Sequence, residues 1–281
     1  MLDLNIVIVN YLSKDAVETG VRSVLADLGG APVNWQITVV DNSGNKDGIK
    51  DFLPQLHPNI RYVDAGGNVG FGKGNNFGFN AVLARYHLVL NPDTLIPSGN
   101  RTIERLVKFM DDNPHVGIAG PKLVYPDGQL QNSCYRFDRP SIMIKPFKHI
   151  NWDKKYRFIK KYSERLEMRE FEHNETRPVD WLLGAALILR HECARAIGWF
   201  DERYFMYLED CDLCQKFWER GTAVYYLHDI VVTHAHERAS ASVPGALTAL
   251  IKNKMARVHL RSWMQYLWKW RRHHKFYAKL S

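Results

Sequence analysis

The first 120 residues alternate short runs of β-branched and other apolar residues with longer amphipathic stretches. The pattern predicts strands near residues 5–10, 36–40, 60–63, 87–90 and 116–119, and helices near residues 16–28, 72–85 and 101–111. Strands and helices in this succession form a largely parallel sheet covered by helices. We therefore expect a Rossmann-like α/β fold, in which ligands bind where the carboxyl ends of the strands meet.

Polar, turn-forming residues follow the predicted strands. They are Asn10-Tyr11, Asp41-Asn42-Ser43, Gly66-Gly67-Asn68 and Asn91-Pro92-Asp93. Hard divalent cations such as Mg²⁺ or Mn²⁺ prefer oxygen ligands and often keep substrate phosphates in their shell. Asp93, directly past a hydrophobic strand, is therefore a candidate metal ligand, although Asn-Pro-Asp is also an ordinary turn sequence.

A glycine-rich segment, residues 66–76, follows the third predicted strand and opens the next predicted helix. Because glycine has no side chain, the backbone amides of such a segment can approach a nucleotide or its phosphates. Gly70 and Lys73 lie within the segment, which matches neither the P-loop nor the dinucleotide-binding pattern. The alternative interpretation is a flexible connection without a ligand.

An acidic triplet, Glu209, Asp210 and Asp212, follows an aromatic run and begins a predicted helix. Crowded carboxylates that aromatic rings partly shield can have raised pKa values, which suits a general base. Asp210 is the best candidate for that base. The alternative is that the triplet only stabilises the first turn of the helix. Cys211 and Cys214 lack a second pair of ligands at zinc spacing, so we interpret them as structural.

Two histidines, His234 and His236, follow the apolar run 230–232. A neutral imidazole can complete the coordination shell of a borderline metal such as Mn²⁺. We select His234 as the candidate ligand and keep His236 as the alternative. Arg238 could contact a phosphate. An isolated histidine is more often a core or surface residue than a ligand.

The cysteine content and the length of the apolar runs indicate where in the cell the protein is expected. Four scattered cysteines in 281 residues favour a reducing compartment. The longest apolar run, Trp181–Leu189, is far shorter than the ~20 residues of a membrane-spanning helix. The chain starts with an apolar strand pattern rather than the basic lead of a signal peptide. We expect a cytoplasmic protein.

The charge is uneven along the chain. The formal net charge is +8, and residues 238–281 carry +10 because no acidic residue follows Glu237. Apolar and aromatic residues recur among these basic residues at near-helical intervals. We expect residues 250–281 to form a basic amphipathic helix that lies on an anionic membrane. The alternatives are a helix packed on the catalytic domain and a segment that contacts nucleic-acid phosphates.

Taken in order, these motifs resemble glycosyltransferase family 2, and specifically its bacterial rhamnosyltransferase-like branch. The resemblance covers roughly residues 4–240 and includes the segments 8–11, 40–43, 68–72, 91–93, 180–185, 209–212 and His234. It implies a GT-A fold with a mostly parallel central sheet. The implied organisation is a catalytic domain at 1–240 with an acceptor-side insertion at 138–177, followed by a membrane-associating helical tail at 241–281.

The same resemblance implies roles for individual residues. Asp210 is the expected catalytic base, and Asp93 and His234 are the expected metal ligands. The nucleotide-binding residues are expected to be Asn10, Asp41, Asn68, Gly70 and Lys73. The donor- or acceptor-binding residues are expected to be Asn91, Trp181, Gly184, Ala185, Glu209 and Arg238. Asn91 departs from the family pattern, because the usual metal motif has a first carboxylate at this position.

The function implied by the resemblance is an inverting, Mg²⁺- or Mn²⁺-dependent sugar transfer. The expected donor is dTDP-L-rhamnose, with UDP-linked sugars as the alternative. The expected acceptor is a lipid-linked oligosaccharide of bacterial cell-surface polysaccharide synthesis, met at the inner face of the cell membrane. The competing classes are a nucleic-acid-binding protein, which would use the basic tail, and a nucleotidyltransferase.

Overall fold

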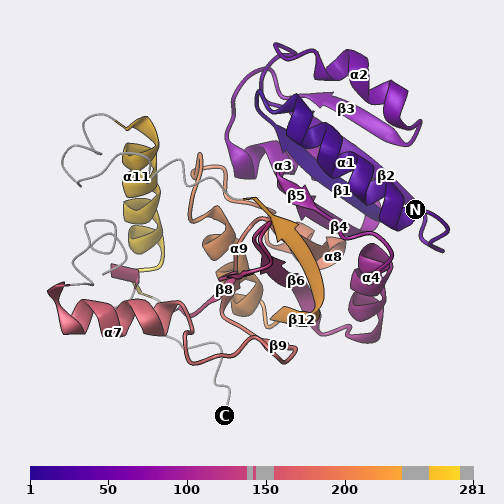
Figure 1. The fold of residues 1–281 in the computed structure, drawn as a ribbon. Helices are drawn as coiled ribbons and strands as arrows, with labels where there is room; N and C mark the ends of the chain where they lie inside the picture. Colours follow the sequence, from indigo (N-terminus) through magenta and orange to yellow (C-terminus); the bar gives the residue numbers. More distant parts are fainter. Residues whose placement is uncertain (138–141, 144–154, 236–252, 273–281) are drawn as a thin grey trace.

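The computed structural model describes residues 1–137, 142–143, 155–235 and 253–272. Its main sheet has the strand order β3-β2-β1-β4-β11-β6-β12-β5 (Figure 1). These strands are β1 (Leu2–Asn10), β2 (Trp35–Asp41), β3 (Ile60–Asp64), β4 (Ala84–Leu90), β5 (Thr94–Leu95), β6 (Val116–Val124), β11 (Ala186–Arg190) and β12 (Ala223–His234). Strands β1 to β4 are parallel, and so are β6 and β12. β11 runs antiparallel to both of its neighbours.

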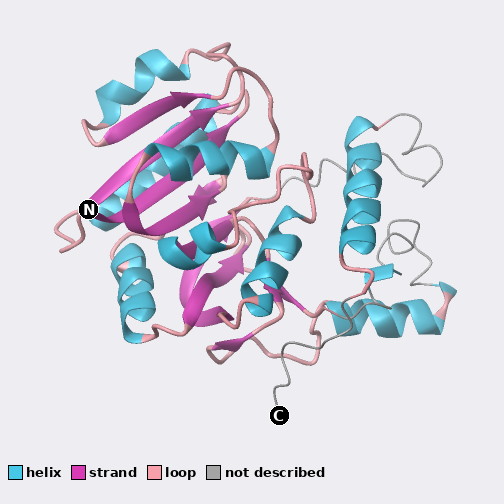
Figure 2. Ribbon diagram, turned by 180° about the vertical axis from the view of Figure 1, so that it is seen from behind, coloured by secondary structure: helices cyan, strands magenta, loops and turns pink. Residues whose placement is uncertain are grey.

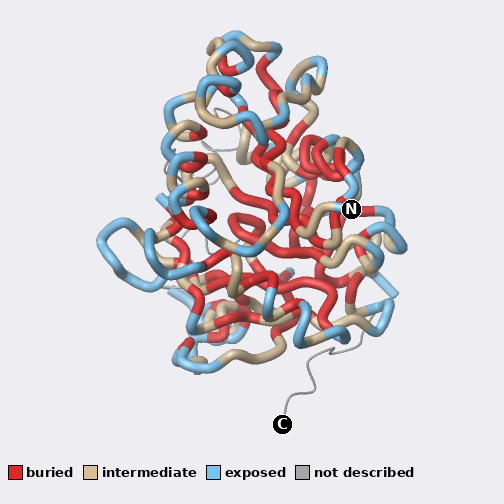
Figure 3. The backbone as a smooth tube through the Cα atoms, turned by 90° about the vertical axis from the view of Figure 1, so that its right-hand side faces the viewer, coloured by how far each residue is buried: buried red, intermediate tan, exposed pale blue. Residues whose placement is uncertain are grey.

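Alternating side chains of β1 build two separate cores. Leu4, Ile6 and Ile8 face one core and Val7 and Val9 face the other, as expected for a strand buried on both faces. The first core is covered by α1 (Lys14–Leu28), α2 (Ile49–Leu56) and α4 (Thr102–Asp112). The second is covered by α3 (Phe71–Ala81), α8 (His191–Ala196) and α9 (Glu209–Glu219). Figures 1 and 2 show the two faces, and Figure 3 shows the buried residues gathered along the sheet.

The predicted βαβ pattern of the first 120 residues is confirmed, with two differences. The structure adds α2, which the sequence pattern did not indicate, and it shortens α3. The predicted helix at 72–85 ends at Ala81, because Val82 is extended and Ala84 already begins β4. A turn at 125–128 joins β6 to the short antiparallel strand β7 (Leu130–Gln131).

Three further short strands lie outside the main strand order. β8 (Cys134–Tyr135) pairs with β10 (Trp181–Leu182), and β9 (Arg177–Pro178) pairs with β12. The described part of the predicted insertion at 138–177 contains α7 (Arg157–Leu166), while residues 138–141 and 144–154 lie outside the described residues.

The helix α11 (Lys254–Lys269) packs against the α/β domain through one face. Tyr266 is 3% exposed and its hydroxyl donates to Gln215 Oε1 of α9. Trp263 and Leu267 join the core that α9 covers. The described part of the basic tail is therefore a helix docked on the domain, and residues 241–252 and 273–281 of the tail lie outside the described residues.

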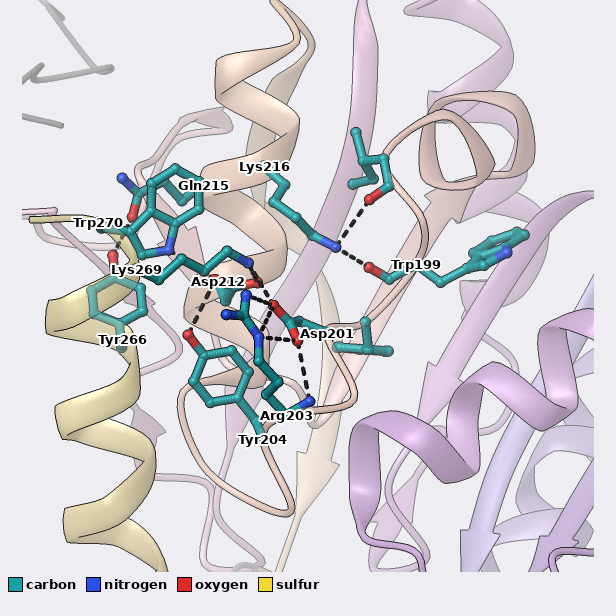
Figure 4. A network of polar contacts seen from close by, with 12 residues as sticks. Trp199, Asp201, Arg203, Tyr204, Asp212, Gln215, Lys216, Tyr266, Lys269 and Trp270 are labelled. Carbon is teal, nitrogen blue, oxygen red and sulfur yellow. Dashed lines mark hydrogen bonds and ion pairs between the residues drawn. The ribbon is translucent and has the colours of Figure 1, made fainter. Parts of the chain in front are cut away.

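A buried ionic network fixes the end of α11 (Figure 4). Lys269 Nζ lies 2.8 Å from Asp201 Oδ2 and 2.7 Å from Asp212 Oδ2. Trp270 Nε1 donates to Asp212 Oδ1 at 2.8 Å, and Arg203 pairs with Asp201. The tail helix is thus tied both to α9 and to the loop that leads into α9.

Two further expectations concern membrane-spanning helices and the cysteines. Of the helices that the structure describes, none combines the length and the apolar character needed to span a bilayer. All four cysteines are free, and Cys211 and Cys214 are buried in the core, which confirms their structural interpretation.

A buried histidine makes the stability depend on pH. His87 of β4 lies between Asn5 and His191, with its Nδ1 3.2 Å from Asn5 Nδ2 and its Nε2 2.9 Å from His191 Nδ1. Burial, with a smaller contribution from the charge of His191, lowers the pKa of His87 to about 3. The unfolded chain binds this proton near pH 6.5.

The stability that neutral His87 contributes is fully present above about pH 6.5 and is lost as the pH falls toward 3. Each pH unit in that window costs up to about 1.4 kcal/mol. We expect the free energy of urea unfolding to fall between pH 6.5 and 5, and His87→Gln to flatten this slope. The exposed His115 provides the control, because His115→Gln should show the same fall in the free energy of unfolding as the wild type. An unchanged slope in His87→Gln would contradict the assignment.

Candidate functional site

The ends of β1 and β2 are joined by side-chain hydrogen bonds. Asn10 and Asp41 are paired in the parallel register, and Asn10 Nδ2 donates to Asp41 Oδ1 at 3.0 Å. The same amide nitrogen lies 3.0 Å from Asp47 Oδ2. Asn10 Oδ1 accepts from the backbone N–H and the hydroxyl of Ser13. Asn10 therefore ties the two strand ends to the start of α1.

Asp41 is buried and accepts hydrogen bonds at both carboxylate oxygens. Besides Asn10, its donors are the backbone N–H groups of Ser43 and Asn45 and the hydroxyl of Tyr62. Burial alone would raise the pKa of Asp41, but the hydrogen bonds outweigh it and lower the pKa below its ordinary value. Four donors fill the acceptor positions of a carboxylate. The expected contact of Asp41 with the nucleotide stays a prediction, and a direct hydrogen bond from the nucleotide to this carboxylate requires one of these donors to move.

The glycine-rich segment is locked to the loop that precedes α9. Gly70 has φ +91°, and a Cβ atom there would lie 2.1 Å from the backbone oxygen of Phe205. Phe71 N donates to the same oxygen at 2.9 Å. Asn68 is exposed and its Oδ1 accepts from Gly70 N, while Lys73 Nζ pairs with Glu202 Oε2 at 3.1 Å. Only glycine fits this contact, which brings the predicted nucleotide loop against residues 201–208.

Asp93 and His234, which are far apart in the sequence, meet at the edge of the sheet. The antiparallel pairing of β12 with β5 sets His234 opposite Thr94, the neighbour of Asp93. His234 Nε2 lies 3.3 Å from Asp93 Oδ1 and 3.2 Å from Asn91 Nδ2. His234 is 1% exposed, whereas the Asp93 side chain is 34% exposed. Asp93 can thus reach a ligand in solvent from beside a fixed imidazole.

Gln131 of β7 orients this imidazole. Its Oε1 lies 2.7 Å from His234 Nδ1. If Nδ1 carries the proton and donates to Gln131, the lone pair of Nε2 points toward Asp93, the arrangement typical of metal-binding histidines. The sequence reasoning missed Gln131, because a glutamine in a short strand after a turn carries no pattern of its own.

The Asp93–His234 pair fits a divalent metal that a nucleotide helps to hold. The described residues contain no group of three or more His, Cys, Asp or Glu side chains at metal-binding distance. Mg²⁺ and Mn²⁺ in nucleotide sites usually take one or two protein ligands and complete their shell with phosphates and water.

Asp210 lies in the first turn of α9, directly after a sharp turn of the backbone. Tyr207 and Leu208 both have positive φ, 70° and 67°, a conformation that costs of order 1 kcal/mol per residue and is common at functional sites. Asp210 Oδ2 accepts from Gly184 N at 3.0 Å, and Oδ1 accepts from Cys211 N at 2.7 Å. The carboxylate is therefore held in one orientation by two backbone groups.

Backbone contacts connect Asp210 with the metal-ligand pair. Gly184 N donates to Asp210, and the next residue, Ala185, accepts through its backbone oxygen from Asn91 N at 2.9 Å. Asn91 in turn contacts His234, which contacts Asp93. The three distant stretches of chain that carry the predicted base and metal ligands are thus brought together.

Of the predicted substrate-binding residues, Trp181 and Glu209 are buried and Arg238 lies outside the described residues. Trp181 is 3% exposed and stacks on Tyr135 with ring centroids 4.1 Å apart. Trp181 thus has a packing role in the structure, and a contact with substrate stays a prediction. Glu209 is also buried, at 6% exposed. Arg238 and the alternative ligand His236 lie outside the described residues.

Relatives of this chain are glycosyltransferases. Residues 5–172 match the family described as Glycosyl transferase family 2. The chain is 30% identical over 233 residues to the N-acetylglucosaminyl-diphospho-decaprenol L-rhamnosyltransferase of Mycobacterium tuberculosis, which covers 75% of this chain and 69% of that protein. It is 24% identical over 276 residues to the rhamnosyltransferase WbbL of Escherichia coli, which covers 93% of this chain and 91% of that protein.

Solved structures of similar fold include two glycosyltransferases with nucleotides and Mn²⁺. The mannosyltransferase PcManGT of Pyrobaculum calidifontis, in complex with GDP-Man and Mn²⁺, matches with a TM-score of 0.57 and 14% identity over 98% of this chain and 79% of its own. GalNAc-T7 with UDP, GalNAc and Mn²⁺ matches with a TM-score of 0.58 and 13% identity over 83% of this chain, which spans 43% of its length. Both similarities show the fold. The chain therefore belongs to glycosyltransferase family 2 and has the GT-A fold that its motifs implied.

Proposed function

We propose that this glycosyltransferase transfers a sugar, with inversion, from a nucleotide diphosphate to a hydroxyl of a lipid-linked acceptor. The observation that carries the proposal is the line of contacts from Asp210 through Gly184 to Asn91, His234 and Asp93. These contacts connect a carboxylate that can act as a general base, Asp210, with two side chains that can bind a metal, Asp93 and His234. Membership of the family favours this proposal over the nucleic-acid-binding and nucleotidyltransferase alternatives.

Asp210 is proposed to act as the general base. Its carboxylate takes the proton of the acceptor hydroxyl while the oxygen attacks the anomeric carbon, and the bond from that carbon to the diphosphate breaks. A single displacement of this kind inverts the anomeric centre. The backbone N–H of Gly184 supports the proposal, because it holds one carboxylate oxygen in place.

Asp93 and His234 are proposed to hold Mg²⁺ or Mn²⁺, with Gln131 fixing the imidazole. A cation bound there offsets the negative charge that grows on the departing nucleoside diphosphate.

The nucleotide is proposed to lie over the ends of β1 and β2 and against the glycine-rich segment. Asn10 and Asp41 shape the first part of this surface. Asn68, Gly70 and Lys73 shape the second. We propose dTDP-L-rhamnose as donor because two relatives are named as rhamnosyltransferases, with a UDP-linked sugar as the alternative.

The acceptor is proposed to be a lipid-linked sugar of cell-surface polysaccharide synthesis, since the Mycobacterium tuberculosis relative is named for a diphospho-decaprenol acceptor. A location at the cytoplasmic face of the membrane suits such an acceptor. The outer side of α11 supports it, because Trp268 and Met264 are 69% and 52% exposed there. The exposed Arg257 lies on the same helix, and the exposed Arg271 and Arg272 follow its end. Basic residues at such positions attract anionic lipids.

Thermal stabilisation by sugar nucleotides, with and without Mn²⁺, tests the proposal. At a ligand concentration of ~100 times Kd, the matching donor should raise Tm by about 5 °C or more. A chelator should remove most of this shift, and Asp93→Ala should reproduce the loss, because the metal contributes to nucleotide binding. Asp127→Ala removes an exposed carboxylate from the nearby turn and should behave like the wild type. A wild-type shift that is independent of metal would contradict the proposed role of Asp93.

A further inference from the structure

A cavity of about 270 Å³ lies between α11 and the loop that leads to Asp210. Glu202, Arg203 and Phe205 of that loop form one wall, and α11 forms the other. Val69, the neighbour of Gly70, completes it. The volume is slightly below the ~300–1,000 Å³ of most small-ligand sites, so it suits one sugar or phosphoryl unit rather than a whole substrate.

Two cations of the cavity have no ion-pair partner among the residues that the structure describes. Arg203 is paired with Asp201, and Glu202 with Lys73. The other two cations are Lys254 and Arg261 of α11, both exposed. Within the described stretches of the chain, no ion pair involves either of them. Two such cations at the edge of one cavity favour an anion with several oxygens, such as a phosphoryl group.

A polar group in the same wall needs a partner. Gln265 lines the cavity, and its buried Oε1 has no hydrogen-bond partner within the described part of the chain. If the amide is turned over, the unpartnered group becomes the NH₂ instead. A sugar hydroxyl can donate or accept, so it satisfies either orientation. Ser262, one turn earlier, already donates to Met206 O.

The walls of the cavity connect it with the acceptor side of the reaction. Residues 202–205 lead directly into the turn that positions Asp210, the group that must meet the acceptor hydroxyl. The opposite wall is the helix whose outer side exposes Trp268 and Met264. A ligand that extends from a membrane toward Asp210 would pass between these walls.

We propose that this cavity binds the phosphorylated sugar end of the lipid-linked acceptor. Lys254 and Arg261 bind its phosphoryl oxygens, and Gln265 bonds to a sugar hydroxyl. The assignment rests on the proposed function, because it takes the acceptor to be a sugar linked to a lipid through phosphate.

Equilibrium binding measured by calorimetry on the full chain tests the assignment. The probes are N-acetylglucosaminyl farnesyl diphosphate, farnesyl diphosphate, and a neutral octyl N-acetylglucosaminide. Lys254→Ala and Arg261→Ala should each weaken the two diphosphates about tenfold, because each removes a charge-assisted contact. Binding of the neutral glycoside, dTDP and UDP should stay within about twofold of the wild type.

Two further variants separate the parts of the ligand. Gln265→Leu should weaken the glycosylated diphosphate about threefold or more and leave farnesyl diphosphate unchanged. Arg257→Ala is the matched control, because Arg257 is exposed on the same helix but does not line the cavity. It should bind every probe like the wild type. Unchanged melting curves of all variants would show that each remains folded.

Wild-type affinity of Lys254→Ala and Arg261→Ala for the diphosphates would overturn the assignment. A parallel loss of nucleotide affinity would overturn it too, because the cavity would then belong to the donor. Displacement of the glycosylated probe by phosphatidylglycerol vesicles would also overturn the assignment, since the cavity would then bind a phospholipid headgroup. The proposed function fails separately, if the wild type binds the probe through Arg261 but transfers no sugar to it from any sugar nucleotide.

Discussion

Replacement of Asp210 by asparagine is expected to lower kcat by about 10²–10⁴-fold, the usual contribution of a general base. The amide oxygen can still accept the hydrogen bond from Gly184 N, but the NH₂ group cannot accept the one from Cys211 N. The amide also cannot take up a proton from the acceptor hydroxyl. The affinity for dTDP or UDP should stay close to that of the wild type, because the change leaves the nucleotide surface intact. The lost hydrogen bond should lower the melting temperature by a few degrees only.

Glu219 provides the matched control for this experiment. It lies exposed at the other end of α9, so Glu219→Gln makes the same change of charge on the same helix, away from Gly184. Its kcat should remain near the wild-type value. Wild-type turnover in Asp210→Asn would show that another group removes the proton.

The architecture of the first 120 residues could be predicted from sequence because its signals are local. The apolar runs of β1 and β2 are nearly continuous, as expected for strands buried on both faces, and glycines and polar residues mark their ends. In such a fold the carboxyl ends of the parallel strands lie at one edge of the sheet. Asn10 and Asp41 are hydrogen-bonded to each other at this edge.

The rest of the site depends on contacts between residues far apart in the chain. The pairing of β12 with β5 brings His234 to Asp93, and the contact of Gln131 with His234 joins residues 103 positions apart. No local pattern encodes either contact. The resemblance to a family indicated that His234 and Asp93 act together, whereas the contact of Gln131 with His234 is known only from the structure.

Burial and charge compensation are equally non-local. Trp181 belongs to a motif near the site, but β10 pairs with β8 and its ring stacks on Tyr135, away from solvent. Lys269 counts toward the basic charge of the tail, yet it is 19% exposed and paired with Asp201 and Asp212. A net charge read from the sequence cannot tell which cations have partners in the fold.

The Lys269 network leads to the second large expected effect. Lys269→Met keeps most of the side-chain volume but leaves the carboxylate of Asp212, 0% exposed, without its cation. Loss of one partner of a buried ion pair usually costs about 3–5 kcal/mol. We expect the free energy of unfolding at pH 7, measured in urea, to fall by about this amount. Lys254→Met, an exposed lysine at the start of the same helix, should change it by less than about 0.5 kcal/mol.

The pH dependence distinguishes a stranded charge from simple loss of packing. Burial raises the pKa of Asp212 above its ordinary value, although Lys269 counteracts this, so the pKa should rise further in Lys269→Met. A carboxyl with a raised pKa in the folded state is most favourable below its unfolded pKa and loses that advantage as the pH rises. The destabilisation by Lys269→Met should therefore shrink as the pH falls and Asp212 becomes protonated. Adding Asp212→Asn to Lys269→Met should restore part of the lost stability at pH 7, because it removes the buried charge of Asp212. A loss that is the same at every pH, with no such rescue, would mean that Lys269 acts only through packing.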